Sequence, residues 1–87
     1  MKYEFVYTNT AFKDIHKLDE KTKQRIKKTL ERYQNDPLHY ACKLTNAECG
    51  EYRFRVGDYR IVFDLNDDKI IILRVGHRKN IYQNLSH

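Results

Sequence analysis

The sequence predicts an α+β fold with an N-terminal strand, an antiparallel two-helix hairpin, a three-stranded antiparallel meander and a short C-terminal helix. Two observations predict this class. Apolar residues recur at every second position near the N-terminus and again in the C-terminal half, as in half-buried strands. Between these segments they recur at intervals of three and four residues, as in amphipathic helices. The chain has 87 residues, enough for one small domain, which we expect to span residues 1–87.

The N-terminal half supplies the first strand and the start of the helices. Residues 2–7 alternate, with Tyr3, Phe5 and Tyr7 on one side, and predict the strand. Residues 8–10 are all able to cap a helix. The first helix then carries three apolar residues at helical spacing, Phe12, Ile15 and Leu18.

Asp19 is the predicted cap of a longer helix over about residues 20–34. This helix should end before Pro37, because a proline pushes the preceding residue out of the helical region. Since the connection between the helices is short, we expect them to form an antiparallel hairpin packed on the sheet. Residues 38–50 show neither the alternating nor the helical spacing of apolar residues and predict a loop. The apolar stripe of the longer helix consists of Ile26, Leu30 and Tyr33.

The central hairpin is predicted by two alternating segments on either side of Gly57-Asp58. Glycine supplies a positive φ and aspartate tolerates one, so these residues suit a two-residue turn. Such a turn fixes which residues face one another across the two strands. The predicted pairs are Val56 with Tyr59, Arg55 with Arg60, Phe54 with Ile61, Arg53 with Val62 and Tyr52 with Phe63.

This register gathers Arg53, Arg55 and Arg60 on one face of the hairpin and leaves the other face apolar. Like charges opposite one another destabilise a sheet by about 0.2–1 kcal/mol per pair, so a bound anion would relieve the repulsion. Guanidinium groups suit the bidentate recognition of phosphate oxygens. The arginines therefore predict a phosphate site, with a solvated basic face as the alternative.

The last strand is predicted over residues 69–75, where an apolar run indicates burial on both faces. The position of Arg74 stays open, because a two-residue turn before the strand puts it opposite Ile61 and a three-residue turn puts it opposite Arg60. Gly76 ends the strand, near the start of its antiparallel neighbour. The chemical groups expected beside the three arginines are therefore those that follow, His77, Arg78 and Tyr82.

Lysine and arginine outnumber aspartate and glutamate by 17 to 12, which gives a formal charge of +5 and favours an anionic partner. Much of this excess lies on the two predicted helices. There it favours sequence-independent contacts to phosphates, with a solvated surface as the alternative. The helical cations are Lys13, Lys17, Lys21, Lys23, Arg25, Lys27, Lys28 and Arg32.

Several other classes of protein are disfavoured. No apolar run approaches the roughly 20 residues of a membrane span. The N-terminus lacks a signal-peptide core, so we expect a cytoplasmic protein with no membrane partner. His39, Cys42 and Cys49 lack a fourth ligand at zinc spacing, so neither a metal nor another cofactor is expected.

The charged groups suit cleavage of RNA by its own 2′-OH. That reaction needs a proton acceptor, a group that stabilises the extra charge on the phosphorane, and a proton donor for the departing 5′ oxygen. Fixed cations supply much of the rate enhancement, and no metal is required. We expect Arg53, Arg55 and Arg60 to hold the scissile phosphate and Arg78 to neutralise developing charge.

Three residues are candidates for moving protons. His77 could be acid or base, since its unperturbed pKa is about 6.5. Tyr82 could stack on a base or, with a pKa lowered by the arginines, act as the general base. Glu51 lies on the same predicted strand face as Arg53 and is a further candidate for the base.

Two segments carry a resemblance to a known family: Tyr52-Arg-Phe-Arg-Val-Gly-Asp-Tyr-Arg-Ile-Val-Phe63 and Ile72-Leu-Arg-Val-Gly-His-Arg-Lys-Asn-Ile-Tyr82. Together with the helical hairpin that ends at Asn35-Asp36-Pro37, they resemble the RelE/ParE toxin superfamily. The resemblance covers nearly the whole chain and implies the fold described above. For the RelE branch it implies a toxin that cleaves mRNA in the ribosomal A site, in contact with rRNA. It also implies a cognate RelB-like antitoxin that silences the toxin.

The resemblance also implies roles for single residues. Arg53 and Arg55 match the strand pair of basic residues around the scissile phosphate, which are lysines in the best-known RelE-type enzymes. Arg60 matches the phosphate-stabilising arginine, Arg78 the tail arginine and Tyr82 the tail tyrosine. Arginine keeps the positive charge of lysine but is a poor proton donor, so the source of the protons stays open.

The tail distinguishes the branches of this superfamily. His77 stands where another member has lysine, and together with Arg78 and Tyr82 it favours the RelE branch. The ParE branch shares the fold but inhibits DNA gyrase and has no ribonuclease site. A third alternative is a degenerate toxin that only binds its antitoxin.

Overall fold

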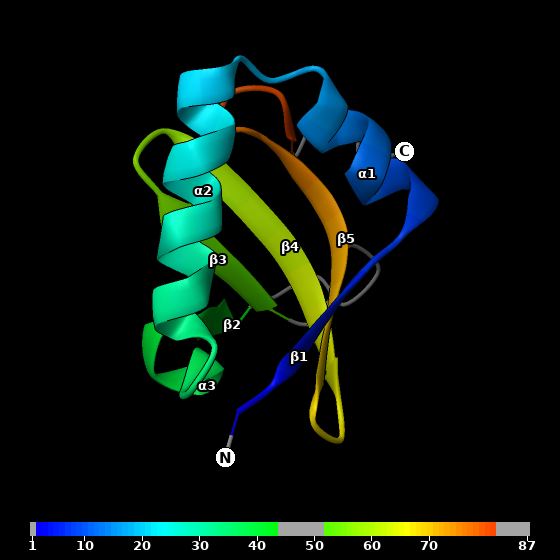
Figure 1. Cartoon of the computed structure of the whole chain (residues 1–87), viewed down its shortest axis with the longest axis vertical. Helices are drawn as coiled ribbons and strands as arrows, with labels where there is room; N and C mark the ends of the chain where they lie inside the picture. Colours follow the sequence, from blue (N-terminus) through cyan, green and yellow to red (C-terminus); the bar gives the residue numbers. More distant parts are fainter. Residues whose placement is uncertain (1, 44–51, 82–87) are drawn as a thin grey trace.

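A computed structural model describes residues 2–43 and 52–81, which form a five-stranded sheet covered on one face by helices (Figure 1). The strand order is β1-β5-β4-β3-β2. This arrangement confirms the predicted α+β class. In chain order the elements are β1 (Glu4–Tyr7), α1 (Asn9–His16), α2 (Glu20–Tyr33), α3 (Pro37–Tyr40), β2 (Cys42–Lys43), β3 (Tyr52–Val56), β4 (Tyr59–Asn66) and β5 (Lys69–His77).

Two short elements lie where the sequence predicts a loop. The helix α3 and the strand β2 occupy residues 37–43, so the loop expectation is wrong for this part of the chain. The strand β2 has two residues and exists because it pairs with β3, a contact that leaves no local pattern in the sequence. Ile81, the last described residue, is assigned as helical, and the other residues of the predicted C-terminal helix lie outside the described residues.

The helix α2 begins at its predicted cap, Asp19, and α1 begins at Thr8, one of three residues that could have capped it. The Thr8 hydroxyl accepts a hydrogen bond from the backbone N–H of Ala11 at 3.1 Å, which satisfies one of the free donors of the first turn of α1. The Asp19 carboxylate accepts one from the N–H of Thr22 at 3.0 Å at the start of α2. This hydrogen bonding by Thr22 lowers the pKa of Asp19.

The central hairpin has the predicted register in all five residue pairs, from Val56 with Tyr59 to Tyr52 with Phe63. Its turn contains Gly57 at φ +60°, the left-handed conformation that glycine adopts without a steric penalty. Alternation along β3 and β4 therefore sends most of their apolar side chains, Phe54 and Ile61 among them, toward the helices. The arginines point to the opposite face together with Val62, which pairs with Arg53.

The pairing of β4 with β5 contains a bulge at Leu73, which neither prediction for Arg74 included. Phe63 faces Ile72, but Val62 faces Arg74, so one residue of β5 is unpaired between them. As a result Arg74 lies opposite Val62 and not opposite Ile61 or Arg60.

The apolar run of β5 is also less completely enclosed than predicted. Ile70 and Ile72 are fully buried on the helix-covered face. Ile71 and Leu73 are only half-buried. The expected burial on both faces of this strand is therefore confirmed on one face and wrong on the other.

The core lies between the sheet and the two long helices. Ile26 and Leu30 of α2 are buried, and the ring of Tyr33 packs 5.0 Å from that of Phe54, as the predicted stripe requires. Phe12 differs from expectation, because its side chain is 63% exposed. On α1 the fully buried residue is its neighbour Ala11, which points toward the sheet.

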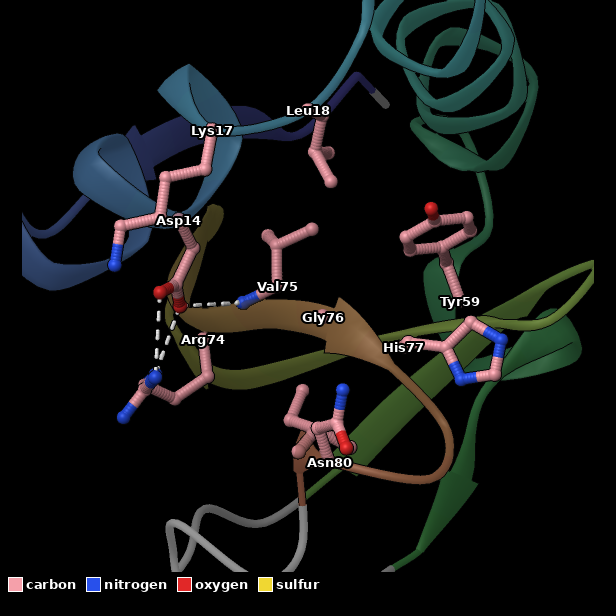
Figure 2. A pocket seen from close by; sticks show the side chains of 10 residues that line it. Asp14, Lys17, Leu18, Tyr59, Arg74, Val75, Gly76, His77 and Asn80 are labelled. Atoms are coloured by element: carbon pink, nitrogen blue, oxygen red, sulfur yellow. Dashed lines mark hydrogen bonds and ion pairs between the residues drawn. The ribbon is translucent and has the colours of Figure 1, made fainter.

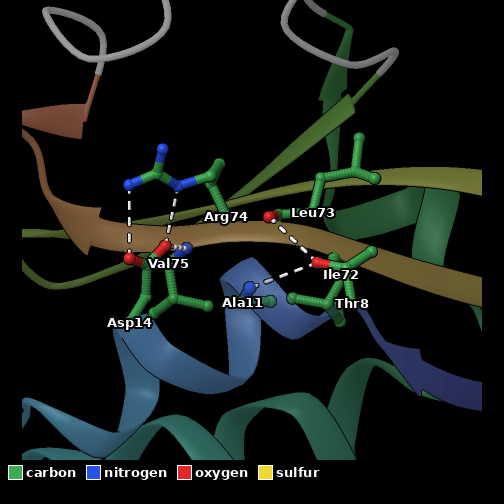
Figure 3. Close-up of polar contacts among 7 residues, drawn as sticks. All are labelled: Thr8, Ala11, Asp14, Ile72, Leu73, Arg74 and Val75. Atoms are coloured by element: carbon green, nitrogen blue, oxygen red, sulfur yellow. Dashed lines mark hydrogen bonds and ion pairs between the residues drawn. The ribbon is translucent and has the colours of Figure 1, made fainter.

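The outer edge of β5 is covered in two ways (Figures 1 and 3). The parallel strand β1 pairs with β5 only as far as Ile72. Beyond it, Asp14 of α1 accepts hydrogen bonds from the backbone N–H of Val75 at 3.1 Å and from the Arg74 guanidinium at 2.8 and 3.2 Å. The carboxylate thus replaces a missing strand partner, and it joins α1 to the end of the sheet that carries the tail.

We predict that Asp14→Ala lowers the free energy of unfolding by about 3 kcal/mol, because it leaves a buried N–H and a partly buried guanidinium without their acceptor. Urea unfolding measures the loss. Asp14→Asn retains one acceptor oxygen and should lose less. Glu31→Ala, at an exposed position of α2, is the matched control and should stay within about 0.5 kcal/mol of the wild type. An Asp14→Ala protein as stable as the control would contradict this role.

Candidate phosphate-binding site

The sheet face turned away from the helices carries the three predicted phosphate-binding arginines, and we call it the arginine face. Arg55 and Arg60 face one another across the hairpin, and Arg53 faces Val62. Arg55 is exposed and Arg53 is half-buried, whereas Arg60 is only 8% exposed. The prediction that these three side chains share one face is confirmed by the register.

Arg60 is tied to the backbone of its own turn. Its Nη1 donates to the carbonyl oxygen of Gly57 at 2.8 Å and to that of Tyr59 at 2.9 Å. Hydrogen bonds from a charged group are the stronger kind, and they hold the turn in shape. Arg60 is therefore part of the architecture of the hairpin as well as a source of positive charge on the arginine face.

The tail is attached to the same turn, which brings Arg78 beside the hairpin. The backbone N–H of Arg78 donates to the carbonyl oxygen of Asp58 at 2.8 Å. Its Nε lies 3.7 Å from the Asp58 carboxylate, in an ion pair that is mostly exposed to solvent. Ile81 then packs against Gly76, which faces Arg60 across the sheet, so the tail turns toward the arginine face.

His77 lies on the other side of the sheet from the arginines. It faces Tyr59, and the two rings meet edge to face at 5.6 Å (Figure 2). Its Nδ1 accepts a hydrogen bond from the N–H of Lys79 at 3.2 Å. The expectation that His77 accompanies the arginines is wrong, because alternation along β5 turns every second side chain toward the helices.

The side chain of His77 lines a separate pocket of about 290 Å³. Figure 2 shows this pocket between α1 and the end of β5, with the ion pair of Asp14 and Arg74 along one side and Tyr59 on the other. The pocket also receives the side chains of Lys17 and Asn80. It therefore opens at the edge of the sheet and not on the arginine face.

The predicted helical cations lie on the helices that cover the opposite face. Lys13 lies in the last turn of α1 and Lys17 is the C-cap of that helix, and the other six belong to α2. All are exposed except Lys23, which is half-buried and 4.0 Å from Glu20. Arg25 also lies against the turn between β3 and β4. The two predicted groups of cations thus form two separate surfaces, which approach one another at this turn.

Some residues near the arginines were not predicted. Cys42 of β2 faces Arg53, so its exposed thiol belongs to the arginine face. Asp64 also falls on this face by alternation along β4, a signal already present in the sequence. Two predicted residues, Tyr82 and Glu51, lie outside the described residues.

Among residues 2–43 and 52–81, no three histidine, cysteine, aspartate or glutamate side chains gather where they could bind a metal ion. None of the helices in these ranges is long and apolar enough to cross a membrane.

Comparisons with known proteins agree with this fold. Residues 5–82 match the family model described as the ParE toxin of a type II toxin–antitoxin system. Toxin RelE3 of Methanocaldococcus jannaschii is 37% identical over 81 residues, which are 88% of this chain and 92% of that protein. Toxin RelG of Mycobacterium tuberculosis is 30% identical over 86 residues, which are 95% of this chain and 99% of that protein.

Solved structures give the same result. The toxin–antitoxin complex RelBE2 of Mycobacterium tuberculosis contains a chain with a TM-score of 0.80 and 28% identity, covering 90% of this chain and all of that one. The RelB–RelE complex of Methanococcus jannaschii contains a chain with a TM-score of 0.71 and 35% identity, and the match covers 91% of this chain and 96% of that one. The chain therefore belongs to the RelE/ParE superfamily, as a RelE-family toxin of a type II toxin–antitoxin system.

The different burial of two facing arginines leads to a stability prediction. We expect Arg60→Ala to lower the free energy of unfolding by about 1–3 kcal/mol, because two carbonyl groups of the turn lose a charged donor. Arg55→Ala removes the facing, exposed guanidinium and should change stability by less than about 0.5 kcal/mol. Urea unfolding compares the two variants directly. Equal losses would mean that Arg60 does not hold the turn.

Proposed function

We propose that this protein is a ribosome-dependent mRNA endoribonuclease that cleaves the message in the A site by attack of the 2′-OH. The observation that carries the proposal is the arginine face, where Arg53 and Arg55 lie on β3. Arg60 faces Arg55 from β4, and Arg78 lies at the adjoining turn. The membership of the chain in a family of RelE toxins supports it.

In this mechanism the arginines act by charge and position. Arg53 and Arg55 hold two oxygens of the scissile phosphate, and the buried Arg60 adds positive charge from the neighbouring strand β4. The 2′ oxygen attacks phosphorus and the bond to the 5′ oxygen breaks, which leaves a 2′,3′-cyclic phosphate and a 5′-hydroxyl. Arg78, whose present partner is a solvent-exposed carboxylate, neutralises the charge that develops on the phosphorane.

Proton transfer falls to other residues, because guanidinium groups remain protonated near neutral pH. His77 faces the opposite side of the sheet, which argues against its acting on a phosphate bound by the arginines. In this proposal Tyr82 or Glu51 takes the proton from the 2′-OH, and a water molecule gives a proton to the departing 5′ oxygen. No metal ion takes part in the proposed chemistry.

The helical cations supply the contacts to rRNA. Their excess of positive charge on exposed faces of α1 and α2 suits sequence-independent contacts to phosphates. Such a surface on the far side from the arginine face would orient the toxin with its arginines toward the message. The protein would act in the cytoplasm, where its ribosomal substrate is.

The proposed protein partner is a cognate RelB-like antitoxin. The solved relatives include toxins in complex with RelB antitoxins. An apolar groove between the helices supports such a partner, with partly exposed Phe12 and Tyr7 at one end. Lys23 and Lys27 border the groove, so an acidic amphipathic segment would complement it in both shape and charge.

A second candidate function is inhibition of DNA gyrase, since the matching family model is that of the ParE toxin. The fold serves both activities equally well. The two functions differ in the need for the arginine face, because inhibition of gyrase requires no ribonuclease site.

A reconstituted translation reaction tests the proposal. We expect the wild type to cut mRNA only when ribosomes are present and to leave a 2′,3′-cyclic or 3′-phosphate end. Arg55→Ala and Arg78→Ala should each lower the cleavage rate by about 10²–10³-fold, since each removes a group that stabilises the transition state. Lys69→Ala, an exposed cation at the far end of β5, is the matched control and should cleave at the wild-type rate.

Two outcomes would overturn this proposal. Intact mRNA together with loss of gyrase supercoiling activity would establish the ParE-type function. Intact mRNA together with tight binding of the antitoxin would establish a degenerate toxin.

A further inference from the structure

Four arginines from four different segments surround the turn between β3 and β4, residues 57 and 58. Arg55 of β3 and Arg60 of β4 face one another directly before and after it. Arg78 of the tail is paired with the turn residue Asp58, and Arg25 of α2 lies against the turn from the helix side. Asp58 provides the turn with one carboxylate, so the turn is a strongly positive end of the molecule.

The contact of Arg25 with Gly57 is unusually close. A Cβ atom at Gly57 would lie 2.7 Å from Nη2 of Arg25 and 2.9 Å from its Cζ and Nη1. The guanidinium plane therefore occupies the space that any side chain at this position would need. The positive φ favours glycine at position 57, and Arg25 would have to shift to make room for any side chain there.

The charge of Arg25 is not neutralised by an ion pair with any described residue. Within the described part of the chain, no carboxylate forms an ion pair with Arg25 or with Arg55, whereas Arg78 is paired with Asp58. Guanidinium groups that gather without carboxylates repel one another, and an anion between them removes this cost. The geometry thus favours a ligand that brings more than one negative charge to the turn.

We propose that this turn is a second phosphate-binding subsite and that Arg25 binds the phosphate next to the scissile one. This inference rests on the proposed function. Gly57 follows Arg55 by two residues, about 6.6 Å along the strand, which is the scale of one nucleotide step. An RNA chain whose scissile phosphate lies on Arg53 and Arg55 therefore brings its neighbouring phosphate to the turn. Arg25 is thereby assigned to substrate binding and not to the rRNA surface of the helices.

The test uses two 2′-O-methyl oligonucleotides that cannot be cleaved, a dinucleotide with one phosphodiester and a trinucleotide with two, both without terminal phosphates. We expect the wild type to bind the trinucleotide about tenfold more tightly than the dinucleotide, as measured by NMR titration. Arg25→Gln should abolish this gain and leave the affinity for the dinucleotide unchanged. Its salt dependence for the trinucleotide should fall by about 0.7 in log–log slope, the contribution of one phosphate contact.

Arg32→Gln is the matched control. Arg32 lies on the same side of α2 as Arg25, two turns or about 10.5 Å further along, and is exposed. It should keep the full gain from the second phosphodiester. Thermal unfolding of both variants should match the wild type, because neither side chain is buried.

The inference is overturned if the wild type gains nothing from the second phosphodiester, if Arg25→Gln keeps the gain, or if this variant loses affinity equally for both oligonucleotides. Cleavage of mRNA on the ribosome is measured separately on the wild type. If the wild type does not cleave mRNA but binds the trinucleotide more tightly than the dinucleotide through Arg25, the nuclease function is refuted and the subsite is supported. A wild type that cleaves, with a gain independent of Arg25, would refute the subsite alone.

Discussion

The two-residue turn at Gly57-Asp58 determines where the chemistry and the core of this protein lie. It sets the register of β3 and β4, which sends Phe54 and Ile61 toward the helices and Arg53 and Arg55 to the opposite face. A shift of one residue would exchange the two sets, because side chains alternate along a strand. The hydrophobic core therefore enforces the register, and the register assembles the arginines.

The cost of gathering these cations is met by contacts that are local to the turn. Arg60 is buried and donates to two carbonyl groups, and Arg78 approaches Asp58. Arg53 and Arg55 remain more accessible, which suits them to bind a ligand. At the other edge of the sheet, Asp14 fixes the end of β5 and hence the origin of the tail. Stability and the proposed ligand binding are thus divided among arginines that look equivalent in the sequence.

The features that could be predicted from the sequence are those with local causes. The cap at Asp19 and the register of the hairpin depend on neighbouring residues and were predicted correctly, and the cap of α1 was narrowed to residues 8–10. The bulge at Leu73, the strand β2 and the face of His77 depend on pairing between distant segments, and they were missed or predicted wrongly. The contact of Arg25 with the turn is also long-range, so periodicity grouped Arg25 with the other helical cations.

The central claim is that mRNA lies on the arginine face, and a crosslink tests it most directly. Cys42 faces Arg53 and is exposed, so in a Cys49→Ser background it can carry a photoreactive group to this face. A matched probe sits at Lys13→Cys on α1, with both native cysteines replaced by serine. On programmed ribosomes, the account predicts that the Cys42 probe crosslinks to the A-site codon of the mRNA and the α1 probe to rRNA. Crosslinks from Cys42 to rRNA alone, or none to the message, would contradict it.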